Sequence, residues 1–163
     1  MTTQKRVYVE TSIPSFYYEV REEPEMKAMR NWTREWWDNC SCRYEMVTSG
    51  AVLDELSEGN CASKARCIEL LDRMSIVQVE SAVAGIVEAY VRDQIMPGDP
   101  AGDALHLALA SFHKCDFLLT WNCNHLANAN KFDHIRRANT VLGLHTPLIV
   151  TPLELLGDNA SER

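Results

Sequence analysis

The sequence of 163 residues lacks the patterns that identify several common classes of protein. It has six cysteines, but no two of them form a C-x-x-C pair, and their spacing fits no zinc finger. No apolar run approaches the roughly 20 residues of a membrane-spanning helix. Glu10 interrupts the short apolar run near the N-terminus, which argues against a signal peptide. We therefore expect a cytoplasmic protein with no membrane segment and no disulfide framework.

The chain also lacks an excess of basic residues. It carries 23 acidic and 16 basic side chains, which gives a formal net charge of −7. This balance argues against broad electrostatic attraction to nucleic acid. It does not exclude an enzyme that acts on nucleic acid, because acids that cluster around a divalent cation add to the negative total.

Short β-rich runs alternate with helical patterns along the chain. Strands are expected at 6–9, 43–47, 76–79, 116–121 and 147–151, and helices at 24–40, 50–57, 62–74, 81–95, 103–112 and 134–142. We expect a turn at Ile13-Pro14, because the residue before a proline avoids the helical region. Alternation of this kind predicts a parallel sheet with helices on both faces. We therefore expect a single α/β domain over residues 1–163, a three-layer α/β/α sandwich with a central parallel sheet.

The most informative stretch of the sequence runs from Pro97 to Asn130. Asp103 stands where an apolar helix begins, and Asn122 stands where the next strand ends. Polar groups in these places can converge on one point. Asp103 can equally be a helix cap, and His106 lies three residues on, on the same side of the helix.

Further acids precede this stretch. Glu10 falls at the carboxyl end of the first strand, which is where ligands bind in open α/β sheets. Asp54 and Glu55 are neighbours on a helix, about 100° apart, so only one of them can face the sheet. Carboxylates in one pocket repel unless a cation neutralises them, and oxygen ligands suit Mg²⁺ or Mn²⁺. Taken by itself, this spacing is a weak signal for a metal site.

Four motifs, in this order, resemble the PIN domain and especially the VapC-type toxins of toxin–antitoxin pairs: YVETSIPS, VLDEL, GDALHLA and LLTWNCNHL. The resemblance covers nearly the whole chain. It implies a PIN-like sandwich that acts as a metal-dependent ribonuclease with three or four acids. It also implies an RNA substrate, a cognate antitoxin that blocks the site, and a homodimer. The Trp-rich helix at 24–40 is a candidate docking face for the antitoxin.

The resemblance assigns roles to three acids. Glu10 matches the acid after the first strand, where the family usually has Asp. Glu55 matches the acid of the second helix, and Asp103 matches the acid that opens the later helix. We expect these three residues to hold Mg²⁺ or Mn²⁺ and to be the catalytic carboxylates.

The chain departs from the family at the fourth acid. Where many members carry Asp, after the fourth strand or three residues later, this chain has Asn122 and His125. Asn122 can offer a carbonyl oxygen to a metal but brings no charge, so one ion is expected rather than two. We expect Asn122 to complete the metal shell. The residues expected to support that shell from outside are Ser12, Asp99, His106, Thr120 and His125.

Three alternatives remain open at this point. The missing fourth acid and the glutamate at position 10 allow a degenerate PIN module that binds RNA or a protein without cutting. A phosphohydrolase or phosphotransferase with an aspartate nucleophile is the second, although the first strand ends in ETS rather than D-x-D. In the third, every acid is a helix cap or a solvated surface residue. Binding of Mn²⁺ separates the enzyme from the degenerate module.

Overall fold

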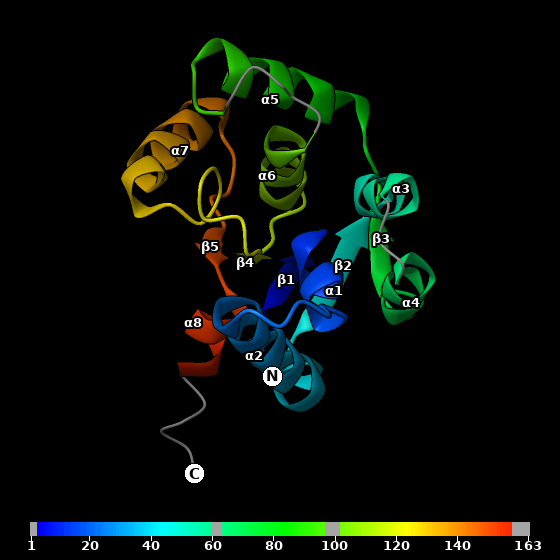
Figure 1. Ribbon diagram of the computed structural model, residues 1–163. Helices are drawn as coiled ribbons and strands as arrows, with labels where there is room; N and C mark the ends of the chain where they lie inside the picture. The colour runs from blue at the N-terminus through cyan, green and yellow to red at the C-terminus, as the bar shows by residue number, and fades with distance from the viewer. Residues whose placement is uncertain (1–2, 60–62, 97–101, 158–163) are drawn as a thin grey trace.

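Five parallel strands form one sheet in the order β3-β2-β1-β4-β5 (Figure 1). The computed structural model describes residues 3–59, 63–96 and 102–157. The strands are β1 Arg6–Val9, β2 Glu45–Ser49, β3 Ser75–Val77, β4 Phe117–Leu119 and β5 Leu148–Val150. The predicted parallel sheet is confirmed, with β1 at its centre.

Helices cover both faces of the sheet. They are α1 Ser12–Tyr17, α2 Pro24–Cys40, α3 Gly50–Glu58, α4 Lys64–Leu70, α5 Ser81–Arg92, α6 Asp103–Phe112, α7 Ala129–Leu142 and α8 Pro152–Gly157, with a 3₁₀ turn, η1, at Ser41–Arg43. Figure 1 shows α1, α2 and α8 on one side of the sheet and α5, α6 and α7 on the other, with α3 and α4 beside β3. The expected α/β/α arrangement is therefore confirmed.

The turn expected at Ile13-Pro14 is wrong, because both residues belong to α1. Pro14 is the third residue of that helix. The amides of the first helical turn have no carbonyl partner within the helix, so a proline there removes no hydrogen bond. Ile13 is therefore helical although it precedes a proline, because Pro14 fits the first turn of the helix.

Several predicted boundaries were also wrong by a few residues. Strand β2 starts two residues later than expected, after η1, and α7 starts at Ala129 rather than at position 134. The missed signal for α7 is Asn128, whose side chain accepts a hydrogen bond from the Asn130 amide at 3.0 Å. Ser81 does not cap α5 but is its first residue, whereas Ser49 caps α3 as expected.

The strand register brings two polar residues together at the carboxyl edge of the sheet. The three apolar residues of β1 that precede Glu10 are fully buried, as expected for a central strand covered on both faces. The amide of Glu10 donates to the carbonyl of Leu119 at 3.2 Å. The amide of Thr120, the next residue of that segment, donates to Val150 at 3.0 Å. Glu10 and Thr120 therefore leave the sheet side by side.

Within the described ranges, no helix is both long enough and apolar enough to span a bilayer.

Candidate metal centre

Glu10 is a buried carboxylate that is held through one of its two oxygens. Its side chain directly follows β1, and the residue is only 6% exposed. Its Oε2 accepts hydrogen bonds from the Ser12 amide at 3.0 Å, from the Ser12 hydroxyl, and from the Thr120 hydroxyl at 2.8 Å. Such bonds offset the cost of removing a charge from water. Its Oε1 makes no hydrogen bond to the described residues, and it is therefore the oxygen available to a cation.

The residues that hold Glu10 also join the ends of β1 and β4. The Ser12 hydroxyl accepts a hydrogen bond from the Trp121 amide at 2.9 Å. The Thr120 hydroxyl accepts one from the Asn122 amide at 3.0 Å. Ser12 and Thr120, both expected to support the site, therefore contact the Glu10 carboxylate and fix its position relative to the loop after β4.

Glu55 extends from α3 toward the same edge of the sheet. Its Oε2 accepts a hydrogen bond from the Thr11 hydroxyl at 2.6 Å, and its Oε1 lies 2.7 Å from Nε2 of His106. Burial raises the pKa of Glu55, but the hydrogen bond and charge of His106 and the bond from Thr11 lower it more, so that the net pKa falls below 4.5. Asp54, the neighbouring acid, is exposed.

His106 lies on α6 and is 1% exposed. Its Nδ1 is 2.7 Å from the hydroxyl of Tyr8, and that hydroxyl is 2.7 Å from the hydroxyl of Ser49. Burial lowers the pKa of His106. The hydrogen bond to Glu55 and the negative charges of Glu10, Glu55 and Asp103 raise it more, so the net pKa lies above 6.5. His106 is therefore in the negative field of all three predicted acids.

Three side chains come close enough to share one ion. One ligand atom from each of Glu10, Glu55 and His106 lies within 4.8 Å of the other two. Asp103, the third predicted acid, is not part of this trio. It is the first residue of α6, directly after the N-cap residue Gly102, and it lies in the first turn, where a carboxylate meets the favourable end of the helix dipole. Its Oδ1 accepts a hydrogen bond from the side-chain amide nitrogen of Asn122 at 2.8 Å.

The loop after β4 turns the Asn122 side chain in a direction that the sequence did not indicate. Its Oδ1 accepts a hydrogen bond from the His125 amide at 3.2 Å, so the amide nitrogen rather than the carbonyl oxygen faces Asp103. Within the described residues, the buried Nδ1 of His125 has no hydrogen-bond partner. Asp99, expected to support the shell, lies outside the described residues.

Sequence analysis missed three residues of the hydrogen-bond network, Tyr8, Thr11 and Ser49. Thr11 could have been found, because it stands next to Glu10 in the ETS motif. Tyr8 carries no local signal, since a tyrosine inside a strand is typical of a core position. Its partners Ser49 and His106 are 41 and 98 positions away along the chain.

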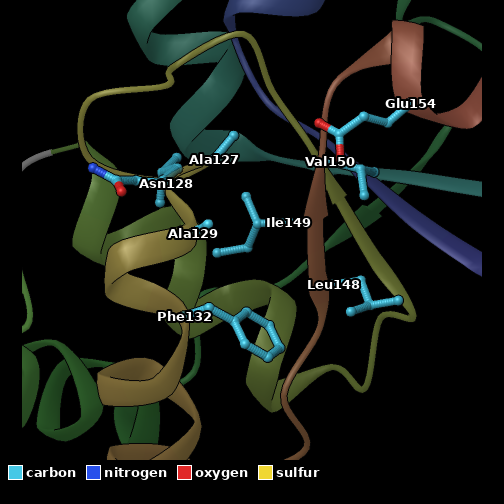
Figure 2. Close-up of a pocket in the computed structure, with 9 residues that line it drawn as sticks. Ala127, Asn128, Ala129, Phe132, Leu148, Ile149, Val150 and Glu154 are labelled. Carbon is cyan, nitrogen blue, oxygen red and sulfur yellow. The ribbon is translucent and has the colours of Figure 1, made fainter.

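A pocket of about 530 Å³ lies elsewhere, between α7 and β5 (Figure 2). Its lining is largely apolar and includes Phe132, Leu148 and Ile149. The charged residue in the lining is Glu154, whose carboxylate accepts a hydrogen bond from the Thr151 amide at 3.2 Å. None of the residues predicted for the metal site lines this pocket, so it is a separate feature of the molecule.

Comparisons with known proteins support the fold. No family model matches the sequence, and no curated protein matches it. Among solved structures, the chain is similar to one in the crystal structure of VapBC2 from Rickettsia felis bound to a DNA fragment from their promoter. The TM-score is 0.52 at 14% sequence identity, over 90% of this chain and 98% of that one. A likeness at this identity concerns the fold, which agrees with the α/β/α sandwich described above.

Proposed function

We propose that this protein is a divalent-metal-dependent ribonuclease of the PIN type. One observation carries the proposal. Glu10 and Glu55, which lie far apart in the sequence, bring carboxylate oxygens to within 4.8 Å of each other at the carboxyl edge of a parallel sheet. This edge is the usual ligand site of such sheets. The likeness of the fold to a chain of a VapBC2 structure supports the same assignment.

The side chains present fit a divalent cation. Two carboxylates in one small space repel each other, and the negative charges of Glu10, Glu55 and Asp103 all act on the neighbouring His106. A cation removes this cost. Carboxylate oxygens are ligands that Mg²⁺ and Mn²⁺ prefer, and Oε1 of Glu10 is free to serve as one.

Each side chain of the site has a separate role in the proposed reaction. A cation bound here would make a water more acidic and would stabilise negative charge on a phosphodiester. Glu10 would bind the cation through Oε1, while Ser12 and Thr120 hold its other oxygen. Glu55 would bind it through the lone pairs that Thr11 and His106 leave unused. Asp103, held by Asn122, would orient a water and accept a proton from it.

The proposal extends to partners. A solved structure with a similar fold is that of VapBC2 bound to a DNA fragment from their promoter, and we propose that this chain pairs with an antitoxin and forms a homodimer. On the Trp-rich α2, Trp36 is fully buried, whereas Trp32 and Trp37 are half-buried. The latter two rings are the tryptophan side chains of this helix that remain partly accessible to a partner.

The test is incubation with mixed RNAs in Mg²⁺, in Mn²⁺ and with a chelator, using the wild-type protein and Asp103→Asn. We expect cleavage with either metal, none with the chelator and almost none with Asp103→Asn. Circular dichroism and thermal melting should show that the variant keeps its fold. Cleavage that continues undiminished in Asp103→Asn contradicts the assignment.

The second candidate is a degenerate module that binds RNA or a protein without cutting it. The neutral amide of Asn122 against Asp103, where relatives are expected to carry an acid, favours this candidate. Calorimetry with Mn²⁺ distinguishes the two functions. The enzyme binds the ion in a manner that depends on Glu10 and Glu55, whereas the module has no need to bind it.

A further inference from the structure

A chain of hydrogen bonds connects the first turn of α3, at Val52, with Glu55 on the same helix, and it passes through Ser49, Tyr8 and His106. The Val52 amide lies 3.4 Å from the Ser49 hydroxyl, which lies 2.7 Å from the Tyr8 hydroxyl. Tyr8 in turn contacts Nδ1 of His106 at 2.7 Å, and Nε2 of His106 contacts Oε1 of Glu55 at 2.7 Å. Because Ser49, Tyr8 and His106 are at most 1% exposed, water has little access to replace any of these partners.

The chemistry of the Glu55 end fixes the position of one proton in this chain of hydrogen bonds. The Glu55 carboxylate can only accept, so Nε2 of His106 must carry a proton. In a neutral ring, Nδ1 then has the lone pair and accepts from the Tyr8 hydroxyl. The Ser49 hydroxyl, which accepts from the Val52 amide, still has its own proton to give to Tyr8, so the far end agrees with this arrangement.

We infer that His106 is a positioning residue whose Nε2 proton holds Oε1 of Glu55, and that this imidazole is not a metal ligand. Within the trio, Glu10 and Glu55 are then the possible ligands. His106 is a clamp, by which we mean a side chain that holds Glu55 in one orientation through a hydrogen bond. A neutral ring has its lone pair on Nδ1, which Tyr8 occupies, and a charged ring has no lone pair at all. In both states the ring has no nitrogen free for a cation.

The clamp fixes the orientation of Glu55 from two separate elements. His106 on α6 holds Oε1, while Thr11, between β1 and α1, holds Oε2. Each carboxylate oxygen has two lone pairs, so each keeps one for a cation. Partners that orient a ligand from outside typically change metal affinity by about 10–100-fold when they are removed. The importance of His106 for the cation rests on the proposed function, whereas the direction of its hydrogen bonds does not.

A matched pair of substitutions separates a clamp from a ligand or a packing residue. The amide nitrogen of glutamine can reach the position of Nε2, whereas that of asparagine can reach only the position of Nδ1. In calorimetry with Mn²⁺, we expect His106→Gln to stay within about threefold of wild type and His106→Asn to bind about 10–100-fold more weakly. Equal losses in the two variants, with both folded, contradict the clamp.

Two measurements on the wild-type protein make the test independent of how the variants fold. In the metal-free protein labelled with ¹⁵N-histidine, NMR at mildly alkaline pH should show His106 with a proton on Nε2 and none on Nδ1. The His106 signals are identified by their loss in His106→Gln. An unprotonated Nε2 overturns the inference.

In the Mn²⁺-loaded protein, pulsed EPR should show no coupling of the metal to a directly bound histidine nitrogen. Such a coupling, if it is lost in His106→Gln, also overturns the inference. If the wild-type protein binds no Mn²⁺, the proposed function fails, and the NMR result alone still decides whether the clamp exists.

Discussion

The site has an inner pair of residues, Glu10 and Glu55, and an outer pair, Asp103 and Asn122, and the two pairs are held very differently. The inner carboxylates accept hydrogen bonds from the Ser12 amide and from four side-chain groups, those of Thr11, Ser12, His106 and Thr120. Among the described residues, the outer carboxylate accepts one, from the side-chain amide of Asn122. The inner pair therefore keeps two negative charges in fixed positions, whereas the outer pair carries one negative charge that fewer hydrogen bonds hold in place.

This difference assigns the two pairs different tasks. A charge that is pre-oriented by several donors loses little freedom when an ion arrives, so binding energy comes mainly from the inner pair. Both residues of the outer pair are half-buried, and Asn122 lies in the loop after β4. We expect changes in the inner pair to act mainly on metal affinity and fold stability. We expect changes in the outer pair to act mainly on cleavage and, through the charge near the ion, more weakly on metal affinity.

The largest effect is expected from Glu55→Gln. Removing this charge from the inner pair should weaken Mn²⁺ binding by about 100-fold or more, because an inner carboxylate contributes at least as much as the groups that orient it. Calorimetry measures the change. The matched control is Asp54→Asn on the exposed face of the same helix, which should bind Mn²⁺ as wild type does. Equal affinities for the two variants would remove Glu55 from the site.

The next largest effect is expected from Ser12→Ala. This change removes one donor to the buried Glu10 carboxylate and also the acceptor of the Trp121 amide. Leaving buried polar groups without partners should lower the free energy of unfolding by about 1–3 kcal/mol. Denaturant titration measures it. In the control, Ser15→Ala, the lost hydroxyl donates to the carbonyl of Thr11, the N-cap residue of α1, and we expect less than about 1 kcal/mol.

A smaller effect is expected from Asn122→Asp, which tests the outer pair directly. The new carboxylate would face Asp103 at the position where Asn122 now donates a hydrogen bond. We expect Mn²⁺ to bind about tenfold more tightly, because affinity rises with the charge of the ligand set. Without metal the two carboxylates repel, so thermal stability should fall. The control, Asn124→Asp on the exposed part of the same loop, should change neither quantity.

The fold could be predicted from the sequence because its signal is spread over many residues. Alternating strand and helix patterns determine a parallel sheet with two covered faces, whatever the individual boundaries. The errors lie where one residue decides the outcome. Pro14 sits inside a first helical turn, and Asn128 caps α7 earlier than apolar periodicity indicates.

The candidate site could be predicted only in part. Glu10 could be placed at the carboxyl edge because it follows a strand, and parallel strands end on the same side. The bond between Tyr8 and His106 could not, because it joins residues 98 positions apart through the packing of β1 against α6. The direction of the Asn122 amide depends on a backbone amide of its own loop. The sequence therefore indicated the carboxylates and, through the family resemblance, Ser12, Thr120 and His106 as supporting residues, but it did not indicate Tyr8, Thr11 and Ser49 or the directions of the hydrogen bonds.

The smallest effect is a pH dependence of stability that belongs to the inner pair. The pKa of Glu55 is lowered from 4.5 despite its burial, by His106 and Thr11, so its contribution to stability is present above pH 4.5 and is lost as the pH falls through the folded value. The pKa of His106 is raised from 6.5 despite its burial, by Glu55 and the neighbouring acids. Its contribution is present below pH 6.5 and is lost as the pH rises through the folded value.

The two contributions overlap between pH 4.5 and 6.5. In that window, the melting temperature of the metal-free wild-type protein should exceed that of Glu55→Gln by the largest margin, and the margin should shrink on both sides. Asp54→Asn should follow the wild-type profile throughout, because its side chain lies outside the network. A margin that does not shrink on either side of the window would show that Glu55 and His106 do not stabilise each other's charge, and the inner pair would then owe its orientation to Thr11, Ser12 and Thr120 alone.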